Sequence, residues 1–264
     1  MQIRFSLVIL ITICLLTTSC KNLFSELAKP DADAAIFYAA KRYSDDRLYD
    51  NAINKIYELS DEYYARRDVQ VFLASAFAGK CGLDFLTFAQ SVIANPGLLT
   101  PMELALDHMK AVNSEADCET AESIMVAVSP NGDGIMSDNV DDAVYMAFIG
   151  LAKVGAVLSR IADTAAQTDN DGVIDIGYNA CAMADADARK IGSGLTLLYN
   201  NLLTTSGAFA AKMSQMTAIC ALAGTTCAKT DGSTFTAPEL VAIKGVVDYD
   251  QFGVGADAVY PSCP

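Results

Sequence analysis

The sequence is poor in basic residues and has a single histidine. It contains 18 Lys and Arg against 32 Asp and Glu, a formal net charge of −14 over 264 residues. Nucleic acids and anionic lipid headgroups are polyanions, so a surface of this charge argues against both as partners. No cysteine pair has CxxC spacing and no cysteine stands beside His108, so a zinc site is not supported either.

Motifs of common enzyme classes are also missing. The sequence has no G-x-S-x-G elbow, Walker A loop, dinucleotide-binding glycine fingerprint or H-E-x-x-H helix. His108 lies between Asp107 and Met109 in a predicted helix, and neighbours on a helix point in different directions, so it has no evident orienting partner. We expect it to be a surface or half-buried helix residue. We predict that the protein is not an enzyme and has no catalytic residues; an enzyme of unknown class is the third alternative.

No stretch alternates apolar and polar residues long enough to predict a sheet, whereas apolar residues recur every three or four positions through most of the chain. The sequence therefore predicts an all-α fold. Its longest predicted helix runs from Asn139 to about Gln167. Lys153, Arg160 and Asp163 interrupt the apolar pattern, so we expect a core helix rather than a membrane span. Capping signals, Thr100-Pro101-Met102-Glu103 and Thr236-Ala237-Pro238-Glu239, predict two more helix starts.

The N-terminus combines a positive residue, an apolar segment and a cysteine. Arg4 precedes the apolar run Phe5–Leu16, which is shorter than the about 20 residues of a membrane span. Small residues then lead to Cys20. This pattern resembles the processing site of bacterial lipoproteins, although Thr17 stands where that family usually has leucine. The resemblance implies a signal peptide over residues 1–19 and a diacylglycerol and a third acyl chain, such as palmitate, on Cys20.

The lipoprotein resemblance also implies a location. Removing the signal leaves about 245 residues with a charge of −15, because Arg4 is lost. Such a protein attaches to a membrane through its N-terminal acyl chains, since two or more chains anchor stably. Lys21 follows the cysteine in place of the aspartate that retains enteric members of the family at the inner membrane. We therefore expect an exported protein, anchored to the outer membrane on its periplasmic face.

After a predicted lipidated tether over residues 20–32, two apolar patterns are separated by the polar turn Ser44–Arg47. They predict a helical hairpin that resembles the tetratricopeptide (TPR) family, whose 34-residue unit places apolar residues at fixed points. If a unit starts at Asp33, the fixed positions of its first helix, helix A, are occupied by Ile36, Ala39, Ala40 and Tyr43. Those of its second helix, helix B, are occupied by Ala52, Ile56 and Leu59. Tyr64 stands where the family usually has proline. A second unit starts at Arg67 with Leu73, Ala74 and Phe77 in phase, but Leu86 replaces its small residue.

The resemblance covers about a quarter of the chain, so two all-α architectures stay open: a TPR-like helical repeat and an irregular helical bundle. We predict a single α-helical domain over residues 33–264. It divides into TPR-like hairpins at 33–98, long core helices at 99–225, and a C-terminal helix and tail at 226–264.

Six cysteines remain after Cys14 leaves with the signal and Cys20 is acylated. Because an exported protein meets oxidising conditions, an even number favours three disulfides, although fifteen connectivities are possible. Cys220 and Cys227 could close a short loop, and Cys263 could hold the C-terminal end. The predicted disulfide-forming residues are Cys81, Cys118, Cys181, Cys220, Cys227 and Cys263.

Two acidic, glycine-containing loops flank the longest helix, at residues 129–134 and 169–175. Asp169, Asp171 and Asp175 are spaced to converge on calcium, the one cofactor that the sequence suggests. A full EF-hand does not fit, because Gln167 and Tyr178 fall where acidic ligands are needed. Acidic turns with glycine also form for local reasons, so a simple turn stays the alternative.

Six tyrosines lie in the first hairpin region, where some pack in the core and others can line a surface for a protein. We assign Tyr38 and Tyr49 to partner binding. The favoured function is a membrane-anchored envelope lipoprotein that acts as a helical-repeat scaffold or adaptor for a protein partner. The alternative is a periplasmic lipoprotein that binds a solute or calcium.

The lipid on Cys20 can be tested by intact mass and detergent partitioning. We expect the wild type to carry acyl mass and enter the detergent phase, and Cys20→Ala to do neither. Cys14→Ala is the matched control, because it changes a cysteine that leaves with the signal. A wild-type protein found wholly in the aqueous phase, without acyl mass, would contradict this prediction.

Overall fold

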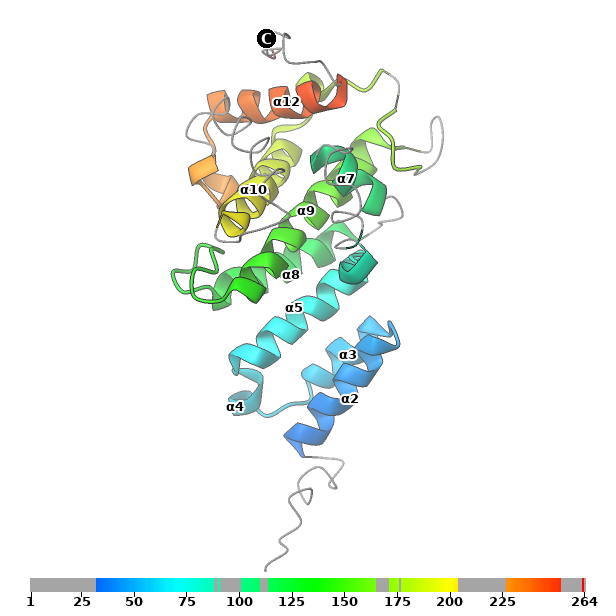
Figure 1. The fold of residues 1–264 in the computed structure, drawn as a ribbon, viewed down its shortest axis with the longest axis vertical. Coiled ribbons are helices and arrows are strands. Elements are labelled where there is room, and N and C mark those ends of the chain that lie inside the picture. The colour runs from blue at the N-terminus through cyan, green and yellow to red at the C-terminus, as the bar shows by residue number, and fades with distance from the viewer. Residues whose placement is uncertain are drawn as a thin grey trace, which may run out of the picture. The chain divides into compact units, whose positions relative to one another are not determined.

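The computed structural model describes residues 32–87, 90, 101–109, 114–164, 171–175, 177–203, 227–252 and 263, without the side chains of 101–104 and 248–252. The regular elements within these residues are all helical, so the predicted all-α class is confirmed (Figure 1). The chain divides into two compact units, Met1–Ala65 and Arg66–Pro264. The boundary falls inside the segment predicted as TPR-like hairpins. The predicted signal peptide and Cys20 lie outside the described residues.

The first unit contains the predicted hairpin. Helices α2 (Asp33–Asp45) and α3 (Tyr49–Ile56) pack against each other, and the short helix α4 (Asp61–Tyr64) follows. The turn between α2 and α3 needs a left-handed backbone conformation at Arg47, where φ is 60°. Ala52 is fully buried, at the position where the TPR resemblance places a small residue. The other buried apolar side chains are Phe37, Ala40, Ile53, Ile56 and Leu59.

The second unit is a bundle around α9 (Val140–Ala162). Helices α7 (Pro101–Met109), α8 (Glu115–Val128) and α10 (Asp185–Leu202) contact α9, and α12 (Ala237–Phe252) packs against α10 and against the 3-10 turn η1 (Ala180–Ala182) (Figure 1). Helix α5 (Arg67–Cys81) begins where the second TPR-like unit was expected. Its main partner is α8, which follows α7 in the chain, so this pairing differs from a hairpin of consecutive helices. The TPR-like repeat stays a prediction.

Helix α9 begins and ends at polar residues. The side chain of Asn139 accepts hydrogen bonds from the backbone N–H groups of Asp141 at 3.0 Å and Asp142 at 3.2 Å, which caps the N-terminus. Asp163 is its C-cap, earlier than the predicted end near Gln167. Between these ends α9 is buried on nearly all sides, including Lys153 and Ser159. It is long and apolar enough to cross a membrane, but 78% of its apolar stretch is buried inside the protein, which supports the predicted core role.

Local signals explain two other helix ends. Helix α12 begins at the predicted place, where the backbone N–H of Thr236 donates to the Glu239 carboxylate at 2.7 Å. Helix α5 ends at Gly82, which has a φ of 112°, and the N–H of Leu83 donates to the carbonyl of Ala78 at 2.9 Å. Helix α7 begins at Pro101 as expected. The helix predicted over Ala208–Ala223 lies outside the described residues.

Glycines allow α9 and α10 to cross closely. A Cβ atom built on Gly150 would lie 2.6 Å from the carbonyl oxygen of Gly194, and one built on Gly194 would lie 2.5 Å from that of Gly150. Any larger side chain at either position would therefore clash with the backbone of the other helix. Backbone atoms, unlike side-chain atoms, cannot change rotamer to relieve the clash. The two glycines set the distance between the helices on which the core is built.

The change Gly150→Ala should lower the free energy of unfolding by about 1–3 kcal/mol, because it overpacks this crossing. The sign is diagnostic, since alanine in an unpacked helix interior stabilises by about 0.5–1 kcal/mol relative to glycine. Urea denaturation followed by circular dichroism measures the difference. Increased stability of the variant would mean that the helices do not touch here.

Candidate functional site

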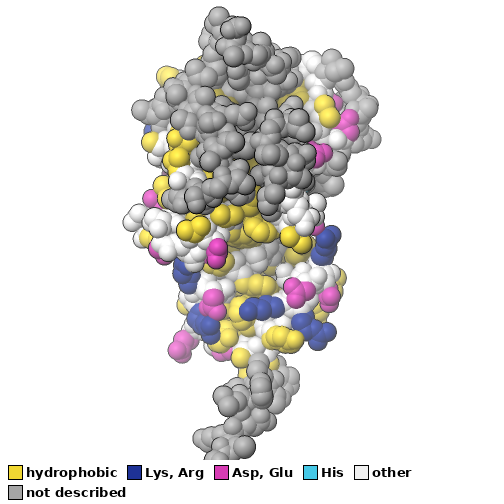
Figure 2. Space-filling view, in the orientation of Figure 1, with side chains coloured by type: hydrophobic (Ala, Val, Ile, Leu, Met, Phe, Trp, Pro, Cys, Tyr) yellow, Lys and Arg dark blue, Asp and Glu magenta, His cyan; other side chains and the backbone are white. Residues whose placement is uncertain are grey.

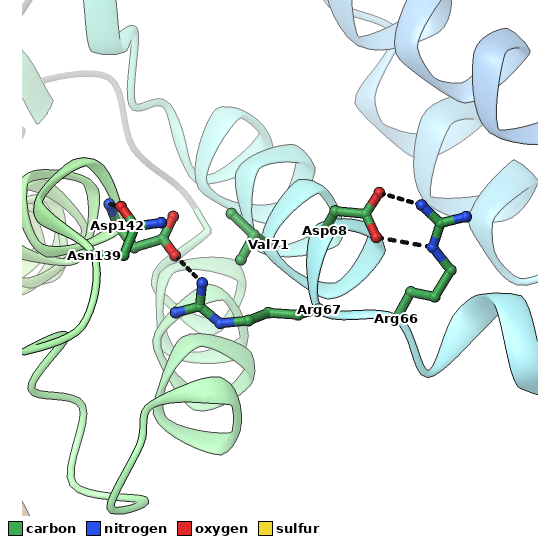
Figure 3. A pocket seen from close by; sticks show the side chains of 6 residues that line it. All are labelled: Arg66, Arg67, Asp68, Val71, Asn139 and Asp142. Atoms are coloured by element: carbon green, nitrogen blue, oxygen red, sulfur yellow. Dashed lines mark hydrogen bonds and ion pairs between the residues drawn. The ribbon is translucent and has the colours of Figure 1, made fainter.

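A cleft of about 600 Å³ lies at the N-terminal ends of α5 and α9 (Figure 3). An Arg67 guanidinium nitrogen lies 2.6 Å from the Asp142 carboxylate, and Arg66 binds Asp68 through two nitrogens at 2.8 and 3.0 Å. Figure 3 shows the two guanidinium groups pointing away from each other. Because both arginines already bind carboxylates, an anion entering the cleft has to displace one of them. The cleft also includes Val71 and Asn139.

A charged cluster is buried between α8, α9 and α10. The ammonium group of Lys153, which is 3% exposed, donates to the hydroxyl of Ser193 at 2.6 Å and forms an ion pair with Glu122. A serine beside a lysine can act as a nucleophile when its hydroxyl donates to the amine. Here Ser193 accepts from Lys153 and donates to the carbonyl of Lys190 at 3.1 Å. The cluster therefore has the arrangement of a structural ion pair.

A second ion-pair network joins the same three helices nearer the surface. Glu115 on α8 contacts Lys190 and lies 2.7 Å from the Arg160 Nε atom, while Arg160 also reaches Asp187 at 2.6 Å. Burial raises the pKa of Glu115, but the hydrogen bonds from Lys190 and Arg160 outweigh burial and hold the pKa below its ordinary value. A lowered carboxyl pKa contributes stability above its unfolded-state value, and this contribution is lost as pH falls through the folded-state value.

The loop after α9 holds two of the three predicted calcium ligands. Asp171 accepts a hydrogen bond from the N–H of Val173 at 2.9 Å, and Asp175 accepts from the N–H and hydroxyl of Thr164 at 3.0 and 2.8 Å. Asp169 lies outside the described residues. In the described part of the chain no three His, Cys, Asp or Glu side chains are placed to hold a metal ion. The Asp169, Asp171 and Asp175 ligand set stays a prediction.

Sequence reasoning missed Asp163 as a site residue. Its side chain is fully buried; Oδ2 accepts a hydrogen bond from the N–H of Gly172 at 2.9 Å, and the backbone of Asp171 also hydrogen-bonds to the carboxylate. Burial raises the pKa of Asp163, and the nearby Asp171 and Asp175 carboxylates add to the rise, which the hydrogen bonds from the backbone of Gly172 and Asp171 only partly offset. The available sequence signal was an acidic residue at the end of a long helix, where the helix dipole disfavours negative charge.

The first acidic loop is organised by a buried amide. Asn201 accepts from the N–H of Met136 and donates to the carbonyls of Gly134 and Leu197, each at 2.9 Å. The side chain of Asp133 accepts from the N–H of Ile135 at 2.9 Å. These contacts hold the loop in a turn.

The two tyrosines assigned to partner binding differ in accessibility. Tyr38 on α2 is 61% exposed, whereas Tyr49 at the start of α3 is partly buried. Tyr57, which follows α3, is 57% exposed and stands out only in the structure. His108 is half-buried on α7, as expected for an ordinary helix residue.

Disulfides stabilise the second unit. Cys81 at the end of α5 is bonded to Cys118 on α8, and Cys181 in η1 is bonded to Cys263, with Cα atoms 5.2 Å apart in each pair. Cys227 is also disulfide-bonded, and Cys220 lies outside the described residues. The prediction that these cysteines form disulfides is thus confirmed for Cys81, Cys118, Cys181, Cys227 and Cys263.

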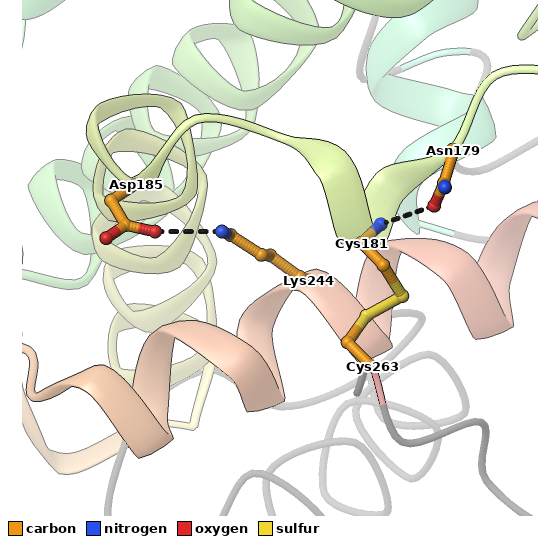
Figure 4. Close-up of a disulfide and its surroundings, with 5 residues drawn as sticks. All are labelled: Asn179, Cys181, Asp185, Lys244 and Cys263. Carbon is orange, nitrogen blue, oxygen red and sulfur yellow. Dashed lines mark hydrogen bonds and ion pairs between the residues drawn. A yellow bond between two sulfur atoms is a disulfide. The ribbon is translucent and has the colours of Figure 1, made fainter.

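The Cys181–Cys263 disulfide lies in a region with further ties between elements (Figure 4). Asn179 accepts a hydrogen bond from the N–H of Cys181 at 3.0 Å. Lys244 on α12 lies 2.8 Å from Asp185 on α10. The disulfide joins residues 82 positions apart, and a long closed loop restricts the unfolded chain most strongly. It therefore holds the C-terminal end against the bundle.

No family model matches the sequence, and no curated protein or solved structure is significantly similar to it. Functional arguments therefore depend on the chain's own residues.

The buried ion pair can be tested with a pair of matched variants on α8. Glu122→Gln should lower the free energy of unfolding by about 3 kcal/mol, because it leaves the buried ammonium of Lys153 without its counter-charge. Glu119→Gln makes the same change at a side chain that is 40% exposed and pairs with Lys190, and should cost less than about 1 kcal/mol. Equal losses in urea denaturation would rule out a special role for the buried pair.

Proposed function

We propose that the protein is an exported, lipid-anchored envelope protein that binds a protein partner through its N-terminal helical hairpin. The observation that carries the proposal is the exposure of three large apolar side chains on a small unit. Tyr38 is 61%, Tyr57 57% and Leu48 47% exposed. Aromatic side chains of this kind contribute most of the binding energy in many protein interfaces, because they bring apolar area with a polar group.

The helices that present these side chains are held in place by contacts within the unit. The N–H and hydroxyl of Ser60 donate to the Asp33 carboxylate at 2.9 and 2.6 Å, which ties the start of α2 to the start of α4. The rings of Phe37 and Tyr63 meet edge to face with centroids 6.0 Å apart. A surface that is already ordered loses less conformational entropy on binding, so the ordered hairpin favours binding of a protein partner.

The charges around the hairpin suit a protein rather than a polyanion. Figure 2 shows basic, acidic and hydrophobic side chains interspersed on the face over α2 and α3. The Nζ atom of Lys41 lies 4.3 Å from the centre of the Phe37 ring. Lys55 and Glu58 form an exposed ion pair at 2.7 Å. Mixed charge of this kind provides a polar rim around apolar contacts and no continuous basic surface for nucleic acid.

The sequence supplies the anchoring part of the proposal. A lipid on Cys20 would be separated from Asp33 by 13 positions, a span of at most about 45 Å when the chain is fully extended. Along the chain, the hairpin would then be the first folded part after the anchor. A partner in the same membrane or in the adjacent periplasm is within reach of such a tether.

Cross-linking in envelope fractions, followed by purification of the lipoprotein, tests the partner surface. Tyr38→Ala and Tyr57→Ala should each reduce the recovery of a specific cross-linked partner at least about fivefold, the effect of losing roughly 1 kcal/mol of binding energy. Leu203→Ala, which removes a side chain that is 53% exposed in the second unit, should change nothing.

All three variants should keep the melting temperature of the wild type, because the altered side chains face solvent. If both tyrosine variants retain every partner, the hairpin is the wrong surface. Tyr49→Ala is less diagnostic, since a partly buried side chain also contributes to folding.

A further inference from the structure

We propose that Asn131 is a site of spontaneous covalent modification, at which the side-chain amide is lost as ammonia and replaced by a carboxylate. The attacking group is the backbone nitrogen of Gly132, the next residue in the chain. The site lies in the first acidic loop, at residues 129–134, which has no part in the proposed function. The modification therefore depends neither on the hairpin surface nor on the proposed partner.

The reaction needs no co-reactant besides water. The backbone nitrogen of Gly132 forms a bond to Cγ of Asn131, which closes a cyclic imide. The bond from Cγ to the side-chain nitrogen breaks, and this nitrogen takes the proton from the Gly132 nitrogen and leaves as ammonia. Water then opens the imide. Opening at Cγ gives aspartate, whereas opening at the backbone carbonyl carbon gives isoaspartate, in which the main chain runs through the side chain.

The side chain of Asn131 is accessible to this attack. It is exposed and makes no hydrogen bond with any residue that the structure describes. Its amide can therefore rotate toward the backbone without giving up a partner. The nucleophile belongs to the adjacent residue, so the two groups react within one molecule at a high effective concentration.

Gly132 lowers the steric barrier to ring closure. Its φ is 69°, and a Cβ atom built on it would meet no atom within 4 Å, so the space around the attacking nitrogen is open. Glycine also reaches more backbone conformations than any other residue, which allows the nitrogen to approach Cγ. Ring closure has to break the hydrogen bond from the Gly132 N–H to the carbonyl of Ser129, which is long at 3.2 Å.

Three Asp-Gly pairs in the described residues could form the same imide, but each is held in place. Every one of these aspartates accepts a hydrogen bond at 2.8 or 2.9 Å from the N–H two residues further on; the pairs are Asp133–Gly134, Asp171–Gly172 and Asp231–Gly232. The N–H groups of Gly134 and Gly172 also donate to side chains, each at 2.9 Å. A carboxylate at neutral pH is, in addition, a poorer electrophile than an amide. Asn131 therefore reacts before these aspartates.

The contacts that hold the loop do not include the reacting pair. The hydroxyl of Ser129, a buried residue, donates to the carbonyl of Val126 at 2.7 Å and accepts from the N–H of Gly134 at 2.9 Å. These bonds flank Asn131 and Gly132. We therefore expect the modified protein to stay folded, with one more negative charge in the loop.

Peptide mapping by mass spectrometry tests the proposal on the full mature protein, kept folded at physiological temperature and pH. The acid products should form at Asn131 at least about tenfold faster than at any other asparagine, which corresponds to a barrier lower by about 1.4 kcal/mol. A protease that cleaves before aspartate separates the two products, because it does not cleave before isoaspartate. The rate should rise with pH, since hydroxide removes the proton from the attacking nitrogen.

Two variants each remove one requirement of the reaction. Asn131→Gln would have to close a larger ring, and Gly132→Ala places a methyl group beside the attacking nitrogen. Each should slow the loss of ammonia at its site at least about tenfold. Gly177→Ala is the matched control, because Gly177 also has a positive φ, 89°, and open surroundings. It should leave the rate at Asn131 unchanged.

Either of two results would overturn the proposal. The first is no acid product at Asn131 in the folded wild type, whether or not the chain unfolded in guanidinium chloride forms it, because the folded loop would then prevent ring closure. The second is a rate in Gly132→Ala equal to that of the wild type, which would mean that water attacks the amide directly and that no imide forms.

Discussion

The burial of α9 on nearly all sides is the constraint on which the larger unit depends. A helix surrounded by other helices needs small residues where its neighbours come closest, and Gly150 faces the backbone of Gly194 on α10 at such a point. Gly155 meets the carbonyl of Ala105 on α7 in the same way. Helices that approach this closely bring large apolar side chains, such as Phe148 and Leu158, into a core with almost no exposed surface.

The same burial explains where the unit places its charges. An apolar helix of 23 residues carries few charged groups, and each one inside the bundle needs a partner. Lys153 finds Glu122 and Ser193, whereas Arg160, near the end of the helix, binds two carboxylates at the surface. Asp163, at the C-terminal end of the helix, is held instead by hydrogen bonds from the backbone of Gly172 and Asp171.

The two units are stabilised by different means. The second unit adds covalent links between elements distant in the chain, through Cys81–Cys118 and Cys181–Cys263. The first unit has a small core, centred on Ala40, Ala52 and Ile56, and leaves several large apolar side chains in contact with solvent. A small hairpin buries only part of its apolar surface. The exposed remainder is therefore available for contacts with another molecule.

Local chemistry in the sequence determined the all-α class, the hairpin at Asp33 and the helix starts at Asn139 and Thr236, because helical periodicity and capping act between residues a few positions apart. The even number of cysteines, which predicts disulfide bonds, could also be counted from the sequence. Only the tertiary structure decided that Cys81 bonds to Cys118, that Lys153 meets Glu122, and that Tyr38 is more exposed than Tyr49. It also decided that Asp163 is buried beside Asp171 and Asp175. These facts depend on which helix faces come together, and local patterns of spacing do not encode that choice.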